Sequence, residues 1–177
     1  LRLIGYGWSF ATILPAIFET SEFLDALHLF DNARIKRIRI GRGVLFFWMG
    51  IGLVFLVGPL LVPRSVAVYL FGFVWVGFVL LLDPLNKLLG NPSLFGDLEE
   101  GRLNTILSLT VAGCICGVLW EFWNYWAHTK WIYTFPITQN IKFFEMPILG
   151  FLGFGPFALE LYAMYHFVAY LKVTGKT

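Results

Sequence analysis

The sequence predicts an all-α protein, a polytopic bundle of transmembrane helices with four clear spans and a possible fifth at the amino-terminal end. Composition is the first reason, because 58% of the 177 residues are hydrophobic and only 14% are charged, whereas about a quarter are charged in soluble domains. The second reason is that the apolar residues form runs of the length that a bilayer requires, about 20 residues in a helix. The third is that the basic residues cluster between these runs, as they do in membrane proteins.

The amino-terminal part is apolar and amphipathic, and its relation to the membrane is open. Leu3 to Phe18 is apolar but short, and Pro15 interrupts it. We expect the end of a fifth span, a half-helix or a segment at the membrane interface. The chain is accordingly divided into residues 1–31, the basic loop 32–43 and the membrane domain 44–177.

Four runs in the membrane domain have the composition of membrane-spanning helices. They contain no charged residue except Glu121 in the third and Glu160 in the fourth. Only Pro63 and Arg64 separate the first two runs, which predicts a tight helical hairpin. The predicted spans are residues 44–62, 65–82, 103–126 and 148–171. Residues 83–102 are interpreted as an ordinary polar connection with solvated acids, Asp97, Glu99 and Glu100.

The distribution of basic residues predicts the orientation of the spans. The five basic residues between Asn32 and Arg42 mark the cytoplasmic side by the positive-inside rule. Alternating spans place Lys87, Arg102, Lys172 and Lys176 on that side too. We therefore predict a multi-pass protein of the bacterial inner (cytoplasmic) membrane, with a cytoplasmic carboxyl terminus and with residues 127–147 on the outer face.

Several functional classes are excluded by residues that are missing. The sequence has no phosphate loop, no dinucleotide fingerprint and no zinc-type spacing. Its only histidines are His28, His128 and His166, too few for a membrane di-iron enzyme, and we predict no metal site. A net charge of +2 is too small to indicate a nucleic-acid partner. The two cysteines, Cys114 and Cys116, point in different directions on a helix and predict no disulfide.

Aromatic and polar residues concentrate near the outer end of the third span and beyond it. Glu121, Asn124 and His128 would share one helical stripe with Gly117, because residues spaced by three, four and seven share a face. The tryptophans are either an aromatic belt at the interface or part of a ligand site. The predicted ligand-binding residues are Trp120, Trp123, Asn124, His128, Trp131, Tyr133, Glu145, Tyr162 and His166.

Two carboxylates lie within or near the membrane and are functional candidates by default, because burying charge there is costly. Glu160 follows a predicted helix break at Pro156, which removes a backbone donor. The alternative for each carboxylate is a structural role, in which it is hydrogen-bonded to neighbouring polar groups or partly exposed to water. A straight-helix estimate separates Glu121 and Glu160 by about 15 Å in depth, so we do not predict a carboxylate pair.

The order of features in the second half resembles the lycopene cyclase domain of carotenoid enzymes. Trp120-Glu121 looks like that family's Trp-acid pair, Trp131-Ile132-Tyr133 like its Trp-x-aromatic element, and Pro147 like the proline that opens the next span. The sequence departs from the family after Pro147, where the family's paired glutamates are missing. The resemblance implies a polytopic membrane enzyme whose carboxylates manage protons on a polyene.

The sequence is compatible with three functions. The favoured one is an accessory or binding subunit that packs a quinone, a carotenoid, a chlorophyll-like pigment or a lipid with its aromatic outer half. Its partners would be membrane lipids and other membrane subunits or further copies of itself. The second is an enzyme that acts on an isoprenoid or lipid by acid–base chemistry, with Glu121 and Glu160 as catalytic residues and with aromatic rings stabilising a carbocation. The third is a small transporter component.

Overall fold

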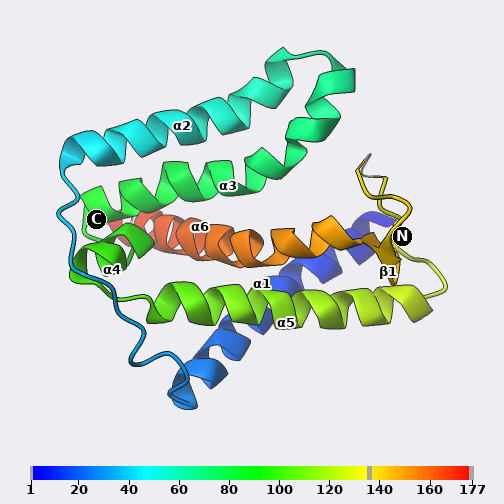
Figure 1. The fold of residues 1–177 in the computed structure, drawn as a ribbon, viewed down its shortest axis with the longest axis horizontal. Coiled ribbons are helices and arrows are strands. Elements are labelled where there is room, and N and C mark those ends of the chain that lie inside the picture. The colour runs from blue at the N-terminus through cyan, green and yellow to red at the C-terminus, as the bar shows by residue number, and fades with distance from the viewer. Residues whose placement is uncertain (1, 135–136, 176–177) are drawn as a thin grey trace.

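The chain is an all-α bundle, as the sequence predicts (Figure 1). The computed structural model describes residues 2–134 and 137–175, apart from the side chains at positions 2, 6 and 10. Its elements, in order, are α1 (Arg2–Ala26), α2 (Arg42–Leu61), α3 (Arg64–Leu89), α4 (Leu94–Glu100), α5 (Asn104–Trp126), β1 (Lys142–Phe143), β2 (Met146–Pro147), a 3-10 helix η1 (Ile148–Gly153) and α6 (Phe154–Thr174).

Four helical segments are long and apolar enough to cross a membrane: Arg42–Leu61, Arg64–Leu89, Asn104–Trp126 and Ile148–Thr174. The protein is therefore a multi-pass membrane protein. These segments contain or closely match the four predicted spans. Because each runs opposite to the previous one in the chain, α2 and α5 begin at the same end of the bundle at which α3 and α6 finish (Figure 1).

The second span is longer than predicted, and the polar connection after it is more ordered. Helix α3 continues to Leu89, and its last turns bury Asp83 and Asn86 completely. Asp97 is also buried, so its assignment as a solvated acid was wrong. The physical reason is that each of these polar groups has a partner, described below, which removes the cost of burial.

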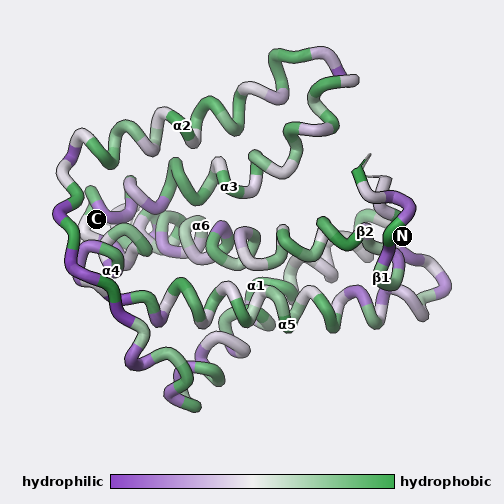
Figure 2. The backbone as a smooth tube through the Cα atoms, in the orientation of Figure 1, coloured by the Kyte–Doolittle hydropathy of each residue, from purple (hydrophilic) through white to green (hydrophobic). Residues whose placement is uncertain are grey.

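Helix α2 lies at the edge of the bundle against α3, and α3 also packs on α6 (Figure 1). The α2–α3 hairpin is apolar along most of its length (Figure 2). The two helices approach closely at Gly52, where an added Cβ would lie 2.7 Å from the backbone nitrogen of Leu81. Many of the other side chains of α2 face outward, including Val54, Leu60 and Leu61. This is the surface expected of a hairpin surrounded by lipid.

Helix α1 is continuous through Pro15, so the predicted interruption was wrong. It is not among the helices that qualify as membrane spans in the described residues. It packs on α5 and contributes Ile17 and Leu24 to the same core as Leu109 and Ala112. This burial offsets the backbone hydrogen bond that a proline removes.

Two glycines let α5 and α6 pack closely, as their spacing predicts for a helix contact. A Cβ added to Gly113 would collide with the backbone oxygen of Phe154, and one added to Gly117 would collide with the Phe154 ring. The last span is also broken, as predicted, because 3-10 turns give way to α-helix at Phe154. Pro156 lies in the first turn of α6, where its missing N–H has no partner to lose.

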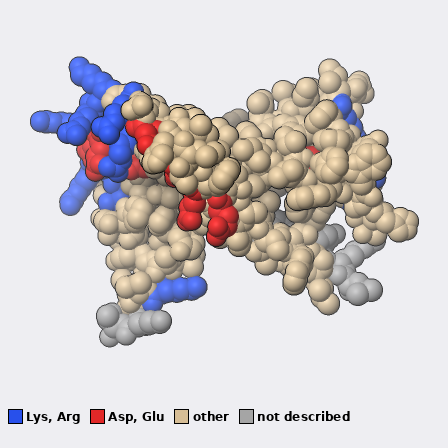
Figure 3. Space-filling model, turned by 90° about the horizontal axis from the view of Figure 1, so that it is seen from below, with Lys and Arg blue, Asp and Glu red and all other residues tan. Residues whose placement is uncertain are grey.

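Lysine and arginine gather at one end of the molecule (Figure 3). This end holds the segment between α1 and α2, the last turn of α3, helix α4 and the end of α6. Arg64, Lys130 and Lys142 belong to the opposite end, where α3 begins and α5 finishes. Lys176, which the sequence assigned to the first group, lies outside the described residues.

Candidate functional site

The side chain of Glu121 is enclosed near the carboxyl-terminal end of α5, where it is 0% exposed. The hydroxyl of Tyr133 donates a hydrogen bond to its Oε1. The same hydroxyl accepts a hydrogen bond from the indole Nε1 of Trp120 at 3.3 Å. Three of the predicted residues therefore form one polar chain, from tryptophan to tyrosine to carboxylate.

Asn124 folds the chain back over the end of α5 and thereby brings Tyr133 to Glu121. Its Oδ1 accepts from the backbone N–H of Trp131 at 2.7 Å, and its Nδ2 donates to the Trp131 carbonyl at 3.0 Å. This double contact imitates a pair of strand hydrogen bonds. Gln139 adds a hydrogen bond of 3.1 Å to the carbonyl of Tyr133, so the returning segment is held on both sides.

A short hairpin, β1–β2, covers the same end of the bundle. Its antiparallel strands pair Lys142 with Pro147 and Phe143 with Met146. Phe144 occupies the turn with φ of 56°, an uncommon conformation for a residue other than glycine. The turn also presents Glu145, which forms an ion pair with Lys130. The backbone of Glu145 and the side chain of Asn124 lie near the carboxylate of Glu121 and help to stabilise it.

Aromatic rings surround this polar chain. The rings of Trp120 and Trp131 lie 6.3 Å apart between centroids. Phe144 of the hairpin lies 5.6 Å from Tyr125, and the ammonium of Lys130 lies 5.2 Å from that same tyrosine ring. The end of the bundle at which α5 finishes therefore combines aromatic walls with one enclosed carboxylate.

Tyr133 keeps its proton over a wider pH range than an exposed tyrosine. Burial raises the pKa of its hydroxyl above the ordinary value, and the neighbouring carboxylate of Glu121 raises it further. A protonated hydroxyl can donate only one hydrogen bond. Because Tyr133 donates to Oε1, the second carboxylate oxygen of Glu121 must find another partner.

Within the described residues, only two buried side-chain oxygens or nitrogens lack a hydrogen-bond partner: Oε2 of Glu121 and Oε2 of Glu160. These are the same two acids that the sequence singles out. Buried polar groups in native proteins are almost always hydrogen-bonded, and an uncompensated buried charge costs several kcal/mol. Each oxygen is therefore a point where a proton, a water molecule or a ligand group would be stabilised.

Glu160 is 6% exposed and lies on the face of α6 that packs on α3. Phe157, three residues earlier, has its ring centroid 6.3 Å from that of Trp75 in α3. Ala163, three residues later, accepts a hydrogen bond of 2.8 Å from Asn86 in α3. Glu121 and Glu160 stay apart, because Gly117 meets Phe154 and the remaining helix rise is roughly 15 Å.

The structure divides the predicted ligand-binding residues between two places. Trp120, Asn124, Trp131, Tyr133 and Glu145 come together around Glu121. His128 follows the end of α5 and is exposed, so it leaves the stripe on which Gly117, Glu121 and Asn124 are buried. Trp123 is 65% exposed and points away from that stripe.

Tyr162 and His166 lie in the other half of α6. Their rings are 4.3 Å apart, and the electrostatic neighbours of Tyr162 are Asp97, Asp83 and Arg102. These neighbours belong to the basic end of the bundle. The expectation that both residues belong with the outer aromatic half was therefore wrong, because α6 carries them away from it.

A polar network at the basic end was missed by the sequence reasoning. Asp83 accepts hydrogen bonds from the backbone N–H groups of Leu94 and Phe95, both at 2.8 Å, and so caps α4. Asp97 pairs with Arg102 at 2.5 Å. The one available signal was the three-residue spacing of Asp83 and Asn86, which puts both on one helical face directly after an apolar run.

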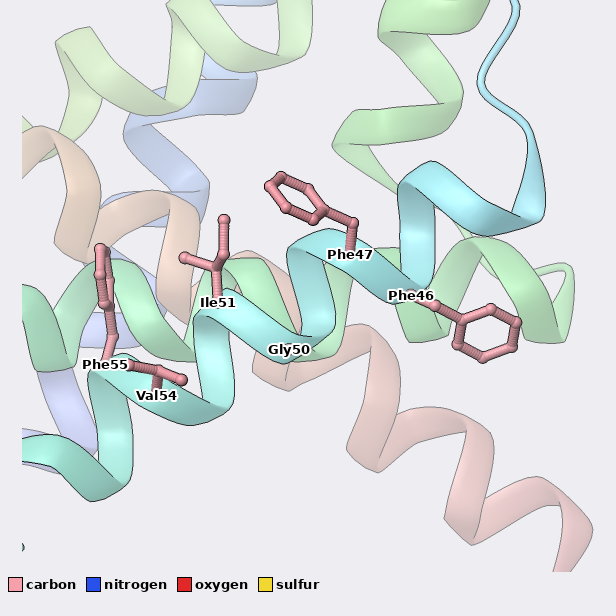
Figure 4. A pocket seen from close by; sticks show the side chains of 6 residues that line it. All are labelled: Phe46, Phe47, Gly50, Ile51, Val54 and Phe55. Atoms are coloured by element: carbon pink, nitrogen blue, oxygen red, sulfur yellow. The ribbon is translucent and has the colours of Figure 1, made fainter.

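An apolar depression lies on the surface of α2 (Figure 4). Phe47, Ile51 and Phe55 form one stripe along it, Phe46 and Val54 lie on the next stripe, and Gly50 leaves room between them. None of the predicted site residues lines it. It is part of the apolar surface of the hairpin and carries no chemistry.

Neither a protein-family profile, nor a curated protein, nor a solved structure matches this chain.

Proposed function

We propose that this multi-pass membrane protein is a binding subunit that holds a hydrophobic cofactor or lipid against its aromatic outer end, within a larger membrane assembly or an assembly of its own copies. The observation that carries the proposal is Oε2 of Glu121, a fully buried oxygen without a hydrogen-bond partner among the described residues. A polar group of a bound molecule would satisfy it.

The chemistry of this oxygen narrows the choice of ligand. An ionised Glu121 accepts a hydrogen bond from a quinol or lipid hydroxyl, and a protonated one donates to a quinone carbonyl. A carotenoid fits only if it carries a polar group. A chlorophyll-like pigment needs a ligand for its metal. Of the two histidines that follow the turn after α1, His128 is exposed and the ring of His166 makes an edge-to-face contact with that of Tyr162. A quinone, a hydroxylated isoprenoid or a lipid therefore suits the site best.

The same outer end supplies the apolar contacts that such a ligand needs. Trp120 and Trp131 flank the polar chain, and Trp123 and Trp126 extend the aromatic surface outward. Tryptophans at this level also anchor a helix at the membrane interface. The two roles are compatible, because a ligand that enters from the lipid passes through the interface.

We further propose that the basic end faces the cytoplasm of a bacterial inner membrane, which places the Glu121 site near the outer leaflet. The support is the concentration of lysine and arginine at the end where α6 finishes (Figure 3). A carboxyl-terminal fusion to green fluorescent protein should fluoresce, and a fusion to alkaline phosphatase should be inactive. The opposite pair of results reverses the orientation.

Ligand co-purification tests the proposal. The protein is extracted from its membrane without detergent exchange, and its organic extract is analysed by mass spectrometry. We expect one hydrophobic molecule with a polar head at a near-stoichiometric amount. Glu121→Leu should lose it, whereas the matched variant Val118→Leu, at an exposed position of the same helix outside the site, should keep most of it. An extract with the composition of the bulk membrane in every case refutes the proposal.

An enzyme that moves protons on an isoprenoid or lipid is the second candidate. Two observations favour it. Glu121 and Glu160, the two carboxylates with an unpaired buried oxygen, both lie within the spans, and the second half of the sequence resembles the lycopene cyclase domain. At roughly 15 Å apart along the helices, the acids would act on different parts of an elongated substrate. Glu121→Gln and Glu160→Gln keep the shape of the side chain and remove its acid–base function. This candidate fails if both variants convert the bound molecule as fast as the wild type.

A further inference from the structure

Residues 33–42, here named the basic strap, cross one end of the bundle from the start of α5 past α4 to the first residue of α2 (Figure 1). Backbone hydrogen bonds of 3.0 Å join Ala33 to Leu103 and Ile35 to Gly101. Further along, the N–H of Ile40 donates to Oε1 of Glu99 at 3.1 Å. The strap is therefore held at both ends against the body of the protein.

The strap carries positive charge that the described residues do not neutralise. Its exposed cations are Arg34, Lys36, Arg37, Arg39 and Arg42, and none of them forms a salt bridge within the part of the chain that the structure describes. The acids near the strap already form salt bridges with other residues. Glu99 pairs with Lys87, and Asp97 and Glu100 both pair with Arg102.

Two arginines face each other where the strap begins. Arg34 and Arg102 are partners in an antiparallel bridge, so their side chains leave the same face. They line a polar depression with Asn104 and Asp31, and Asp31 is paired with His28 at 2.6 Å. Because Arg102 is paired with Asp97 and Glu100, the cation without a salt bridge at this point is Arg34. A phosphate beside Arg34 would pair with it, since the guanidinium fork matches its geometry.

Apolar side chains alternate with the cations of the strap. Ile35 is 42% exposed and Ile38 is 47% exposed, although both are strongly hydrophobic. They lie at the end of the bundle where the spans α2 and α5 begin, which is the level of the lipid head groups. Exposed isoleucines beside arginines are typical of segments that lie in the membrane interface.

We propose that the basic strap binds the head groups of anionic phospholipids, with one lipid phosphate held at Arg34. The proposal is independent of the ligand at Glu121. It rests on charge complementarity, because the anionic leaflet attracts polybasic segments close to the membrane. A strap fixed by backbone hydrogen bonds presents its cations in a constant arrangement, so the lipids should remain with the protein through purification.

Lipid retention tests the proposal on the intact protein. The protein is reconstituted in nanodiscs of phosphatidylcholine with a minor fraction of phosphatidylglycerol, and the retained lipids are measured by native mass spectrometry. We expect phosphatidylglycerol to be enriched in the wild type. The variant Lys36→Gln/Arg37→Gln/Arg39→Gln should reduce the enrichment by about tenfold or more. The control Arg64→Gln/Lys142→Gln removes cations from the opposite end and should retain it.

Two further measurements keep the test decisive if the triple variant fails to fold. With the unmodified protein, raising the salt to about 1 M should weaken the enrichment through screening. Arg34→Gln alone should release the most tightly held lipid. Equal enrichment in the strap and control variants overturns the proposal, as does displacement of the lipid by inorganic phosphate, which would assign the site to a soluble anion.

Discussion

The hydroxyl of Tyr133 donates a hydrogen bond to Oε1 of Glu121, which lies in the last turns of α5, twelve residues earlier in the chain. This contact closes the returning loop over a buried acid and leaves the second oxygen of that acid unpaired. The same hydrogen bond therefore matters both for the structure of the loop and for the proposed binding role of the carboxylate.

Tyr133→Phe should destabilise the protein by about 1–3 kcal/mol, because it removes the hydrogen bond that a buried carboxyl oxygen accepts. Thermal unfolding in a mild detergent measures the loss. Tyr125→Phe is the matched control, since this more exposed tyrosine contributes its ring rather than its hydroxyl to the contacts at this end. Equal melting temperatures for the two variants would show that the Tyr133 hydrogen bond is not formed.

Gly113→Ala should destabilise the helix bundle by roughly 1–3 kcal/mol through overpacking. The new methyl group would meet the backbone oxygen of Phe154 and the Cβ of Ala158, so α5 and α6 would have to separate. Gly50→Ala in α2 is the control, because nothing lies within 4 Å of its added Cβ, and it should be neutral or slightly stabilising. The reverse order of stability would contradict the packing of α5 on α6.

Asp83→Ala should weaken α4 by about 0.5–2 kcal/mol, the usual cost of losing a cap. The backbone N–H groups of Leu94 and Phe95 lose their acceptors and should exchange faster with deuterium. Amide exchange followed by mass spectrometry detects this in the peptide that contains α4. Glu100→Ala, at an exposed site on the same helix, should leave the exchange of those two amides unchanged.

The attachment of the basic strap to α4 should depend on pH. The hydrogen bond from Lys87 lowers the pKa of Glu99 below its ordinary value of 4.5, and the N–H of Ile40 lowers it further. A lowered pKa contributes stability that is present above the ordinary value and is lost as the pH falls through the folded value. Below about pH 4.5, the amide of Ile40 should therefore exchange faster than the intrinsic pH dependence of amide exchange predicts. Glu99→Gln should remove most of this dependence, and an unchanged acid response in this variant would rule out Glu99 as the anchor.

The spans and the core contacts of α5 could be predicted because their causes are local. The run from Leu103 to Trp126 is apolar, and the spacing of Gly113, Gly117, Glu121 and Asn124 puts them on one face. The structure buries all four. The break before α6 was predictable for the same reason, because glycine and proline act on their own backbone.

The remaining features depend on contacts between distant residues. Asp83 can be buried because the backbone N–H groups at the start of α4 donate hydrogen bonds to it. The sequence pattern of α3 does not predict these donors. Pro15 is tolerated because α1 packs on α5. Tyr133 reaches Glu121 only through the double hydrogen bond of Asn124 to Trp131, which is a matter of loop geometry rather than of residue type.

The central claim is that a bound molecule satisfies Oε2 of Glu121. A high-resolution density map of the protein, purified in its native lipid and with any partner subunits, tests this most directly. We expect a non-protein feature with a polar group within hydrogen-bond distance of that oxygen and an apolar body along Trp120 and Trp131. A map in which only protein atoms or water surround the oxygen would contradict it.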